Sequence, residues 1–465
     1  MPLNFKQVFL PSPLKWKYWL FVAFCIRSLF FFLQVHISHI GGLWGVEMND
    51  TYGYLIPIEN LVNKGAYSPD FRMPGYGMFY LPLYILFSKT LACNLLIIIQ
   101  LLFSSLSVYV FALIAQKVFR NVYFFYSAFY LYLVYYYVCC YDSLLLTESF
   151  TTSFIIFSVF YIIRYFETGK KKNIIVSGIL IMCIVFMRPV FLPMLLFYPF
   201  IMFMNGTKTL KNTLYTSLLF LTPFIIADSL WIIHNYKNYG KIVPLTKTIY
   251  APQYDSTYRK QCDAFIQSWG GGFYRDHGSL ANIPDYVYTS KFNADSLKKV
   301  RRYISLADSL PYPGKQKYLD LIAEKLSTYS QSIKTEKPFL YYVKAPLANL
   351  KTINNPSTQF CFIFFIPKYG HYAAFFYGWL YLIVFFSAVI GLILLAKKIF
   401  TEPLVILITG IPLYILFIHC FILRLPENRY LIPVYPLVLL FSLYTYFIIY
   451  NMISGGKRAS SPSKN

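Results

Sequence analysis

The stretch Gly45–Tyr80, GVEMNDTYGYLIPIENLVNKGAYSPDFRMPGYGMFY, decides how the rest of this chain can be interpreted. It follows a first apolar run and carries two carboxylates, Glu47 and Asp50. Arg72 comes later, in an Arg-Met-Pro-Gly-Tyr turn. The chain has only 19 acidic residues in 465. Acids beside a membrane edge, followed by an arginine, therefore indicate a candidate reaction centre rather than a solvated loop.

The composition is that of a membrane protein. Hydrophobic residues make up 57% of the chain and charged residues only 13%, whereas a soluble domain carries about 25% charge. The net charge of +23 is explained by the bias of basic residues toward the cytoplasmic side and by attraction to anionic lipid. No aromatic-basic recognition motif of the usual kinds is present, so we expect the lipid bilayer as a partner and no nucleic acid.

Apolar runs predict an all-α polytopic membrane protein with about ten transmembrane helices. A spanning helix needs about 20 apolar residues. The expected spans lie near 18–38, 92–116, 121–141, 145–166, 173–187, 190–204, 212–235, 373–396, 403–423 and 430–451. The fifth and sixth are short and meet at Arg188-Pro189, so one broken or re-entrant pair is the alternative. Tyr76–Ser88 is too short to span and is expected to lie along the interface.

Basic residues fix the expected orientation. In the ten-span arrangement they gather on one side, which is therefore expected to be cytoplasmic; this set includes Lys117, Arg120, Lys170–Lys172, Lys208, Lys211, Lys397, Lys398, Lys457 and Arg458. The opposite face receives the first loop, 39–91, and a large polar insert, 236–372. We expect an N-terminal transmembrane module at 1–235, this extracytoplasmic insert, and C-terminal helices with a short cytoplasmic tail at 373–465.

The first loop offers a base and a cation. Glu47 and Asp50, three residues apart on a helix, would share a face, and a partly buried carboxylate can act as a general base. The alternative for Asp50 is that it caps an amphipathic helix that runs to Lys64. Arg72 projects from a turn fixed by Pro and Gly and could bind phosphate bidentately. Its alternative role is a snorkelling anchor for an interfacial helix.

Further charged residues stand at the ends of later spans. Asp142 and Glu148 lie in YDSLLLTESF, and an ionisable group at the rim of an apolar run is a functional-site hypothesis. The alternative for Glu148 is an ion pair with Arg188 that locks two spans together. Arg188 itself stands at a helix break, before Pro189.

Two further segments carry charge near predicted span ends. In WIIHNYKNYGKIVP, Trp231–Pro244, the side chains of His234, Lys237 and Lys241 could contact phosphate, although an ordinary aromatic-basic membrane edge is the alternative. Near the end of the chain, Arg424 and Arg429 flank Glu427, where a Glu-Arg pair between the last two spans is the alternative. Arg72, Arg188 and Arg429 are expected at one membrane face with Glu47 and Asp50 nearby, the arrangement that a lipid-phosphate leaving group requires.

Two of the eight cysteines, Cys262 and Cys361, lie in the polar insert. If that region is extracytoplasmic they could form a disulfide. Two free thiols are the equal alternative.

Taken in order, these segments resemble the C-type glycosyltransferase superfamily, and within it the bacterial relatives of protein O-mannosyltransferases and of the lipid A aminoarabinose transferase. The matching positions are Asp50 with Tyr54, Arg72–Tyr76, Leu145–Glu148, Arg188-Pro189, Asn235-Tyr236 to Gly240 and Pro244, and Arg429-Tyr430 to Pro433. The chain departs from the family pattern in two places. His234 stands where the family often has Arg, and Glu-Met-Asn-Asp replaces an adjacent acid pair, so either Glu47 or Asp50 could be the base.

The resemblance implies a membrane glycosyltransferase of the bacterial inner membrane. It would move a sugar from a polyprenyl-phosphate donor to an extracytoplasmic acceptor, with inversion and with no metal or other cofactor. Asp50 or Glu47 would be the catalytic base. The donor phosphate would be bound by Arg72, Arg188, Arg429 and Lys241, with Tyr54, Tyr76, Glu148, His234, Asn235 and Glu427 as further site candidates. The alternatives are a transporter or flippase of lipid-linked sugars and an enzyme like the O-antigen ligases and polymerases.

Overall fold

The computed structural model describes residues 12–13, 15–38, 43–69, 71–204, 209–246, 257–271, 280, 283–311, 313–355, 361–398 and 401–459. The chain divides into two compact units. Unit 1 comprises residues 1–247, 357–412 and 432–465, and unit 2 comprises residues 248–356 and 413–431. The regular structure in the described residues is helical, apart from two isolated β-bridges.

The helices of unit 1 agree with the apolar runs of the sequence. They are α1 (Trp16–Ser38), α2 (Asn49–Lys64), α3 (Gly77–Leu86), α4 (Lys89–Phe119), α5 (Val122–Val134), α6 (Tyr136–Cys139), η1 (Cys140–Ser143), α7 (Glu148–Thr168), α8 (Lys171–Met187), η2 (Pro189–Phe191), α9 (Met194–Met204), α10 (Leu210–Tyr239), η6 (Phe362–Phe365), α15 (Gly370–Leu395), η9 (Ile432–Val434) and α17 (Tyr435–Ala459). The helix α16 (Pro403–Phe417) begins in unit 1 and continues into unit 2.

Seven helices among the described residues are long and apolar enough to cross a membrane: α1, α4, α7, α10, α15, α16 with its π-helical end, and α17. The bent pair formed by α5 and the segment Tyr136–Ser143, with 55° between its halves, makes an eighth if it is one span. The fifth and sixth expected spans form α8, of 17 residues, and η2 with α9, and they break at Arg188-Pro189 as the sequence indicated. The expected all-α polytopic membrane fold is confirmed.

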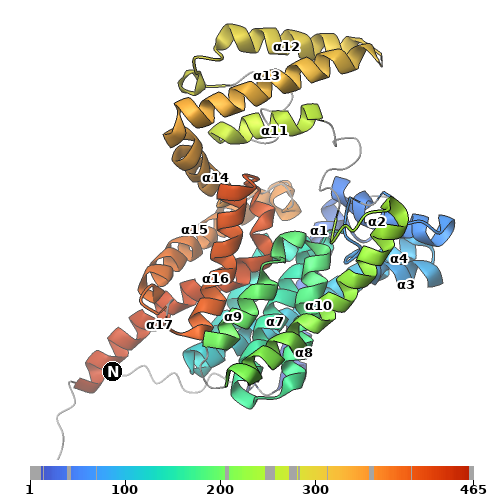
Figure 1. Ribbon diagram of the computed structural model, residues 1–465. Helices are drawn as coiled ribbons and strands as arrows, with labels where there is room; N and C mark the ends of the chain where they lie inside the picture. Colours follow the sequence, from blue (N-terminus) through green and yellow to red (C-terminus); the bar gives the residue numbers. More distant parts are fainter. Residues whose placement is uncertain are drawn as a thin grey trace, which may run out of the picture. The chain divides into compact units, whose positions relative to one another are not determined.

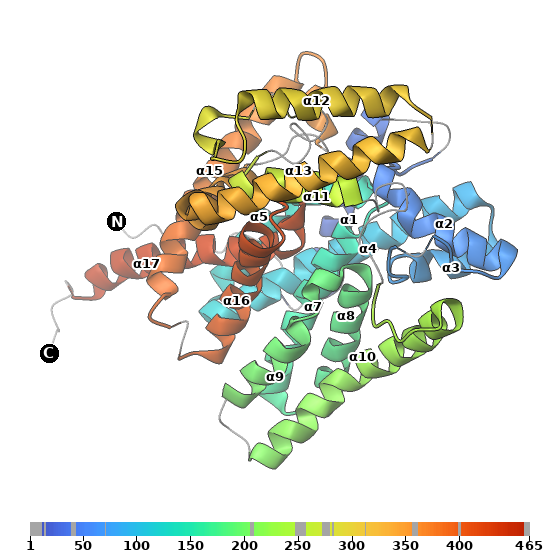
Figure 2. The ribbon, with the colours of Figure 1, turned by 45° about the horizontal axis from the view of Figure 1, so that its top comes forward.

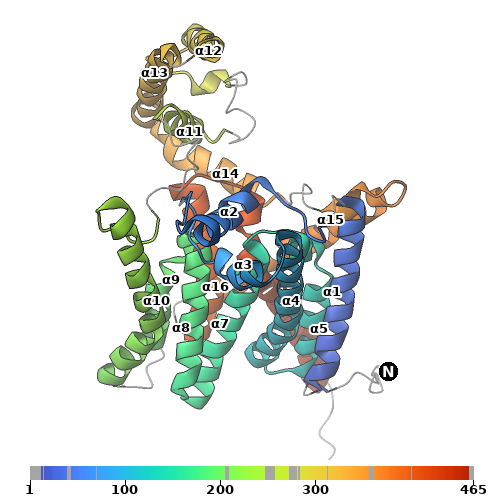
Figure 3. The same ribbon diagram turned by 90° about the vertical axis from the view of Figure 1, so that its right-hand side faces the viewer.

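A short helix is found where the sequence predicted an interfacial one, and its place at the interface stays a prediction. Tyr76–Ser88 contains α3, which has ten residues and is therefore about 15 Å long, half of the apolar thickness of a bilayer. It packs against α2 and α4, and the three helices lie side by side in two views (Figures 2 and 3).

Close approach of neighbouring helices holds unit 1 together. The helices α7, α8 and α10 run side by side (Figure 3). A Cβ on Gly178 of α8 would lie 2.2 Å from the carbonyl oxygen of Phe220 in α10, so this contact requires glycine. Across the α15–α17 contact, the hydroxyls of Ser387 and Ser442 are 2.6 Å apart, and Thr445 donates to the Ser387 carbonyl at 2.6 Å. Small residues at such contacts are typical of membrane helix packing.

Unit 2 has its own apolar core. Its elements are α11 (Thr257–Trp269), η4 (Asp285–Val287), α12 (Ala294–Ser309), α13 (Gly314–Glu336), η5 (Leu340–Lys344), α14 (Ala345–Ile353), η7 (Ile418–Ile422) and η8 (Asn428–Tyr430). The helices α11, α12 and α13 pack together (Figures 1 and 2). In α13, the side chains of Ile322 and Leu326 are fully buried in this core.

Candidate active site

The candidate site is built on the first loop, and α2 sets its geometry. The helix begins at Asn49, and the side-chain oxygen of Thr51 accepts a hydrogen bond from the Met48 amide at 2.9 Å. Met48 is thus the cap, and Asp50 lies in the first turn. The expectation that Glu47 and Asp50 share a helix face is wrong, because Glu47 precedes the helix. The expectation of a helix through Lys64 is confirmed.

Asp50 and Arg72 are directly paired. Arg72 Nη2 donates to Asp50 Oδ1 at 2.8 Å, and the two side chains keep 31% (Arg72) and 26% (Asp50) of their surface exposed. The guanidinium also lies over the ring of Tyr54, 5.2 Å from its centroid. The hydroxyl of Tyr67 donates to the Arg72 carbonyl at 2.9 Å and so fixes the backbone of the turn. The pair is therefore held in place and still reachable from solvent.

The Arg72–Tyr76 turn packs against the end of α8. The Gly75 amide donates to the Phe186 carbonyl at 3.1 Å. A Cβ on Gly75 would lie 2.4 Å from the Phe186 carbonyl carbon, so only glycine fits. The fully buried Tyr76 donates to Gln100 Oε1 at 2.7 Å, and its ring lies 5.5 Å from that of Tyr54. Burial raises the pKa of Tyr76 well above its usual value, so this phenol stays protonated as a donor.

A second ion pair lies beside this turn. Arg188 Nη1 is 3.3 Å from Glu148 Oε1, with side-chain exposures of 11% and 3%. Glu148 interacts electrostatically with Tyr76, whose ring also contacts Phe150, 5.9 Å between centroids. The ion pair considered from the sequence as the alternative for Glu148 therefore exists. It brings Arg188 into one cluster with Asp50, Arg72, Tyr54 and Tyr76.

Glu47 belongs to a different set of contacts. It accepts a hydrogen bond from the Tyr52 hydroxyl at 3.3 Å and interacts electrostatically with Lys89. Lys89 also pairs with Glu59 at 2.9 Å. Glu59 is nine residues after Asp50 in the same helix, a rotation of about 180° at 3.6 residues per turn. The contacts of Glu47 are therefore with the side of α2 away from Asp50.

The segment after α10 folds back toward the first loop. The Asn235 amide donates to the carbonyls of Val243 and Leu245 at 2.7 and 3.2 Å, which holds this return. Thr246 then donates to the Phe71 carbonyl at 3.4 Å, next to Arg72. The Lys241 side chain is exposed.

His234 is stacked rather than aimed at the acid–arginine pair. Its ring lies on Trp231 at 4.7 Å and 17°, and Tyr67 meets both rings edge-on. Because Tyr67 also bonds the Arg72 backbone, this aromatic group supports the turn. Tyr67 and Trp231 were missed by the sequence reasoning, since aromatic residues are too common in this chain to mark a site.

Arg429 and Glu427 belong to unit 2. Arg429 Nε lies 2.6 Å from Glu427 Oε2, so a Glu-Arg pair exists, but it joins two residues of the link and not the two spans themselves. Arg424 instead donates to the carbonyls of Gln267 and Tyr341 at 3.1 and 2.8 Å, within unit 2. A meeting of Arg429 with Arg72 and Arg188 stays a prediction.

Sequence reasoning also missed Arg27. Its Nη1 is 3.2 Å from Asp142 Oδ2, and the two side chains are 1% and 5% exposed. The available signal was an arginine inside an apolar span, which needs a partner.

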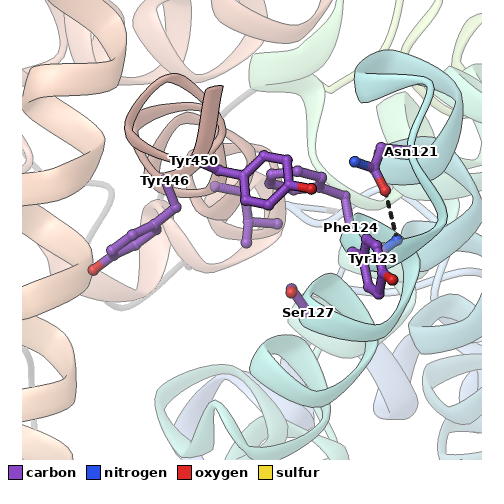
Figure 4. A pocket seen from close by; sticks show the side chains of 7 residues that line it. Asn121, Tyr123, Phe124, Ser127, Tyr446 and Tyr450 are labelled. Carbon is purple, nitrogen blue, oxygen red and sulfur yellow. Dashed lines mark hydrogen bonds between the residues drawn. The ribbon is translucent and has the colours of Figure 1, made fainter. Parts of the chain in front are cut away.

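Other expected features lie outside the cluster. No disulfide forms among the described residues, and the Cys361 sulfur lies 3.7 Å from that of Cys140. A cavity of about 270 Å³ between α5 and α17 is lined by Asn121, Tyr123, Phe124, Ser127, Leu443, Tyr446 and Tyr450 (Figure 4), and it includes none of the site candidates.

The architecture defines a class. The protein is a multi-pass membrane protein, and its fold is similar to that of a C-type glycosyltransferase. The fold is similar to that of the archaeal oligosaccharyltransferase AglB from Archaeoglobus fulgidus, solved in complex with an inhibitory peptide and a dolichol-phosphate, with a TM-score of 0.51 and 12% identity. The match covers 97% of this chain and 52% of AglB, so this chain spans about half of the length of that protein. No protein-family model and no curated protein matches the sequence.

Proposed function

We propose that this protein is an integral-membrane glycosyltransferase. It moves a sugar from a polyprenyl-phosphate donor to an acceptor hydroxyl at the extracytoplasmic face, with inversion at the anomeric carbon. The observation that carries the proposal is the solvent-reachable Asp50–Arg72 pair at 2.8 Å, set in the first loop of a C-type glycosyltransferase fold. AglB, the structural neighbour, was solved with a dolichol-phosphate, which supports a lipid-linked donor here.

Asp50 acts as the general base. Its carboxylate takes the proton of the acceptor hydroxyl while that oxygen bonds to the anomeric carbon, and the bond from that carbon to the donor phosphate breaks. The electron pair leaves with the lipid phosphate. Arg72 orients the Asp50 carboxylate, and its side-chain exposure of 31% leaves it accessible to a phosphate oxygen.

Arg188 supplies a second cation near the leaving phosphate. Glu148 is only 3% exposed, so it positions Arg188 and is not the base. Fixed arginines stabilise the charge that develops on the phosphate without having to reorient. Lys241, exposed on the return segment whose Thr246 donates to the Phe71 carbonyl, is a further candidate for the same phosphate.

The reaction needs no metal in this scheme. Asp50 and Glu148 are each engaged by an arginine, and these arginines neutralise the monophosphate. Transfer by the purified protein is therefore expected to continue in excess EDTA. Loss of transfer in EDTA that returns with a divalent cation would contradict this part of the proposal.

The decisive experiment identifies substrate and product together. Lipids and glycans of cells with and without this protein are compared by mass spectrometry to find the missing sugar and its acceptor. The lipid donor that accumulates is then supplied to the purified protein in proteoliposomes. The proposal expects glycosylated acceptor and polyprenyl monophosphate in equal amounts.

The same assay tests the two rival functions. An enzyme like the O-antigen ligases would release polyprenyl diphosphate instead of monophosphate. A transporter would move the lipid between leaflets without forming product. The transporter has one observation in its favour, the bent helix pair beside the buried Arg27–Asp142 pair, because broken helices and buried charges line transport sites. Movement without transfer would replace our proposal with this one.

A further inference from the structure

A buried polar cluster lies under the first loop, and it consists of Arg27, Ser104, Asp142 and Ser149. Arg27 Nη1 lies 3.2 Å from Asp142 Oδ2. The hydroxyls of Ser104 and Ser149 donate to the two Asp142 oxygens, each at 2.7 Å. Arg27 Nη2 donates to the Tyr132 carbonyl at 3.0 Å. We call these four residues the Asp142 cluster.

The cluster joins elements that are distant in sequence. Arg27 comes from α1, Ser104 from α4, Asp142 from η1 and Ser149 from α7. All four residues are at most 5% exposed. Because a buried charge is costly unless it is paired and hydrogen-bonded, these contacts hold the Asp142 segment in one place.

The backbone next to Asp142 binds the start of the first loop. The Val46 amide donates to the Ser143 carbonyl at 2.8 Å, and the Leu145 amide donates to the Val46 carbonyl at 3.1 Å. The hydroxyl of Thr51 donates to the Leu145 carbonyl at 2.9 Å. Asp50 lies between these two points of attachment, Val46 and Thr51.

A second branch reaches the arginine turn. Gln100 donates to the Leu144 carbonyl at 3.0 Å and accepts from the Tyr76 hydroxyl at 2.7 Å. Tyr76 ends the turn that carries Arg72. One anchored segment thus supports both the carboxylate and the cation of the candidate site.

We propose that the Asp142 cluster positions the reaction centre by anchoring the segment that binds both Val46 and Gln100. Arg27 and Asp142 are positioning residues, since neither contacts Asp50 or Arg72. This inference rests on the proposed function for its kinetic part. A misplacement of about 1 Å can cost about 100-fold in rate, so loosening this segment is expected to reduce turnover more than donor affinity.

Two variants test the proposal. Arg27→Met combined with Asp142→Ala removes both charges at once, so no buried charge is left alone. Ser104→Ala combined with Ser149→Ala removes two donors to Asp142 and keeps the ion pair, which gives a milder change if the first variant folds poorly.

A matched control exists on the same two helices. Lys117 of α4 pairs with Glu167 of α7 at 2.7 Å, far along both helices from Ser104 and Ser149. Lys117→Gln with Glu167→Gln removes an α4–α7 ion pair that has no contact with the first loop.

Hydrogen exchange of the peptide that contains Val46–Thr51 is measured together with kcat and the KM for the donor. We expect exchange to rise by about tenfold or more in the cluster variants, with kcat falling by at least about tenfold and KM changing by less than about threefold. The control should leave all three unchanged. Normal exchange and kcat in either folded cluster variant would overturn the inference, as would an equal effect of the control.

If the proposed function is wrong, these measurements will give a different result. The wild-type protein would then show no transfer, while the exchange measurement would still report whether the cluster anchors the loop. Wild-type exchange in the cluster variants would reject the anchoring by itself.

Discussion

At the scale of single residues, Asp50 and Glu47 are neighbours in sequence with different partners. Asp50 pairs with Arg72, whereas Glu47 accepts from Tyr52 and interacts with Lys89. We expect Asp50→Asn to fold normally and to lose transfer by about 10²–10⁴-fold, the usual contribution of a general base. Glu47→Gln should stay within a fewfold of wild type. The measurement is initial transfer rate with the melting temperature as a check on folding.

The opposite result is equally informative for the mechanism. Normal transfer by folded Asp50→Asn, with loss in Glu47→Gln, would give the base role to Glu47. Normal transfer by both variants would reject the mechanism.

Gly75 provides a steric test of the arginine turn. Its missing Cβ would lie 2.4 Å from backbone at Phe186, so Gly75→Ala must displace the turn or the end of α8. We expect a destabilisation of about 1–3 kcal/mol, typical of overpacking, and a lower transfer rate. Gly378→Ala is the control, because a Cβ there meets nothing within 4 Å. Unchanged stability and rate in Gly75→Ala, measured by thermal unfolding and transfer, would show that the close approach is not required.

At the scale of elements, the segment that begins η6 packs on the core of unit 1. The amides of Phe362 and Ile363 donate to Gln34 Oε1 and to the Tyr136 hydroxyl at 3.3 and 3.2 Å. The Cys361 and Cys140 sulfurs, 3.7 Å apart, report the same contact. Copper-phenanthroline oxidation should therefore link Cys140 to Cys361, as seen by mass spectrometry of non-reduced peptides.

Two cysteine variants identify the thiols that form this link. Cys361→Ser should abolish the link, and Cys262→Ser should leave it intact. A link between Cys262 and Cys361 would instead support the disulfide considered from the sequence.

In unit 2, the carboxylate of Glu336, at the end of α13, binds the turn at Ser290. Ser290 donates to Glu336 through its amide and its hydroxyl, each at 2.7 Å. The hydrogen bond from the Ser290 amide, followed in size by the one from its hydroxyl, holds the pKa of Glu336 below its ordinary value of 4.5. A lowered pKa means that this contact stabilises the folded state above pH 4.5 and is lost as the pH falls through the folded-state value. Unit 2 should therefore open locally at this turn in acid.

Pepsin, which works in acid, can report this opening. Cleavage near Phe292 should accelerate below about pH 4.5 in the wild-type protein. Glu336→Gln should cleave faster already at pH 5 and depend less on pH, whereas Glu324→Gln on the exposed side of α13 should match wild type. Identical profiles for all three proteins would reject the contribution of Glu336.

At the scale of the molecule, the sequence predicts the helices better than it predicts which side chains contact one another. Apolar runs located the helical segments of unit 1, since the bilayer sets their length and composition. The pairing of Glu148 with Arg188 was foreseen as an alternative, because a buried acid needs a cation. The pairing of Arg27 with Asp142, 115 residues apart, depends on packing between distant helices, which periodicity does not encode.

The contact between the C-terminal end of α8 and the first loop indicates that this short helix crosses the membrane. Its 17 residues span about 26 Å, and Phe186 near its end accepts from Gly75 of the first loop. If that loop is outside, the break at Arg188-Pro189 is also outside, and α8 and η2–α9 both cross. A re-entrant pair would bury the break instead. We expect Leu192→Cys to react with a membrane-impermeant maleimide in intact cells, whereas Lys172→Cys and Lys211→Cys react only after permeabilisation. The wild-type chain is the background control, and an unreactive Leu192→Cys with a reactive Asn63→Cys in the first loop would support the re-entrant arrangement.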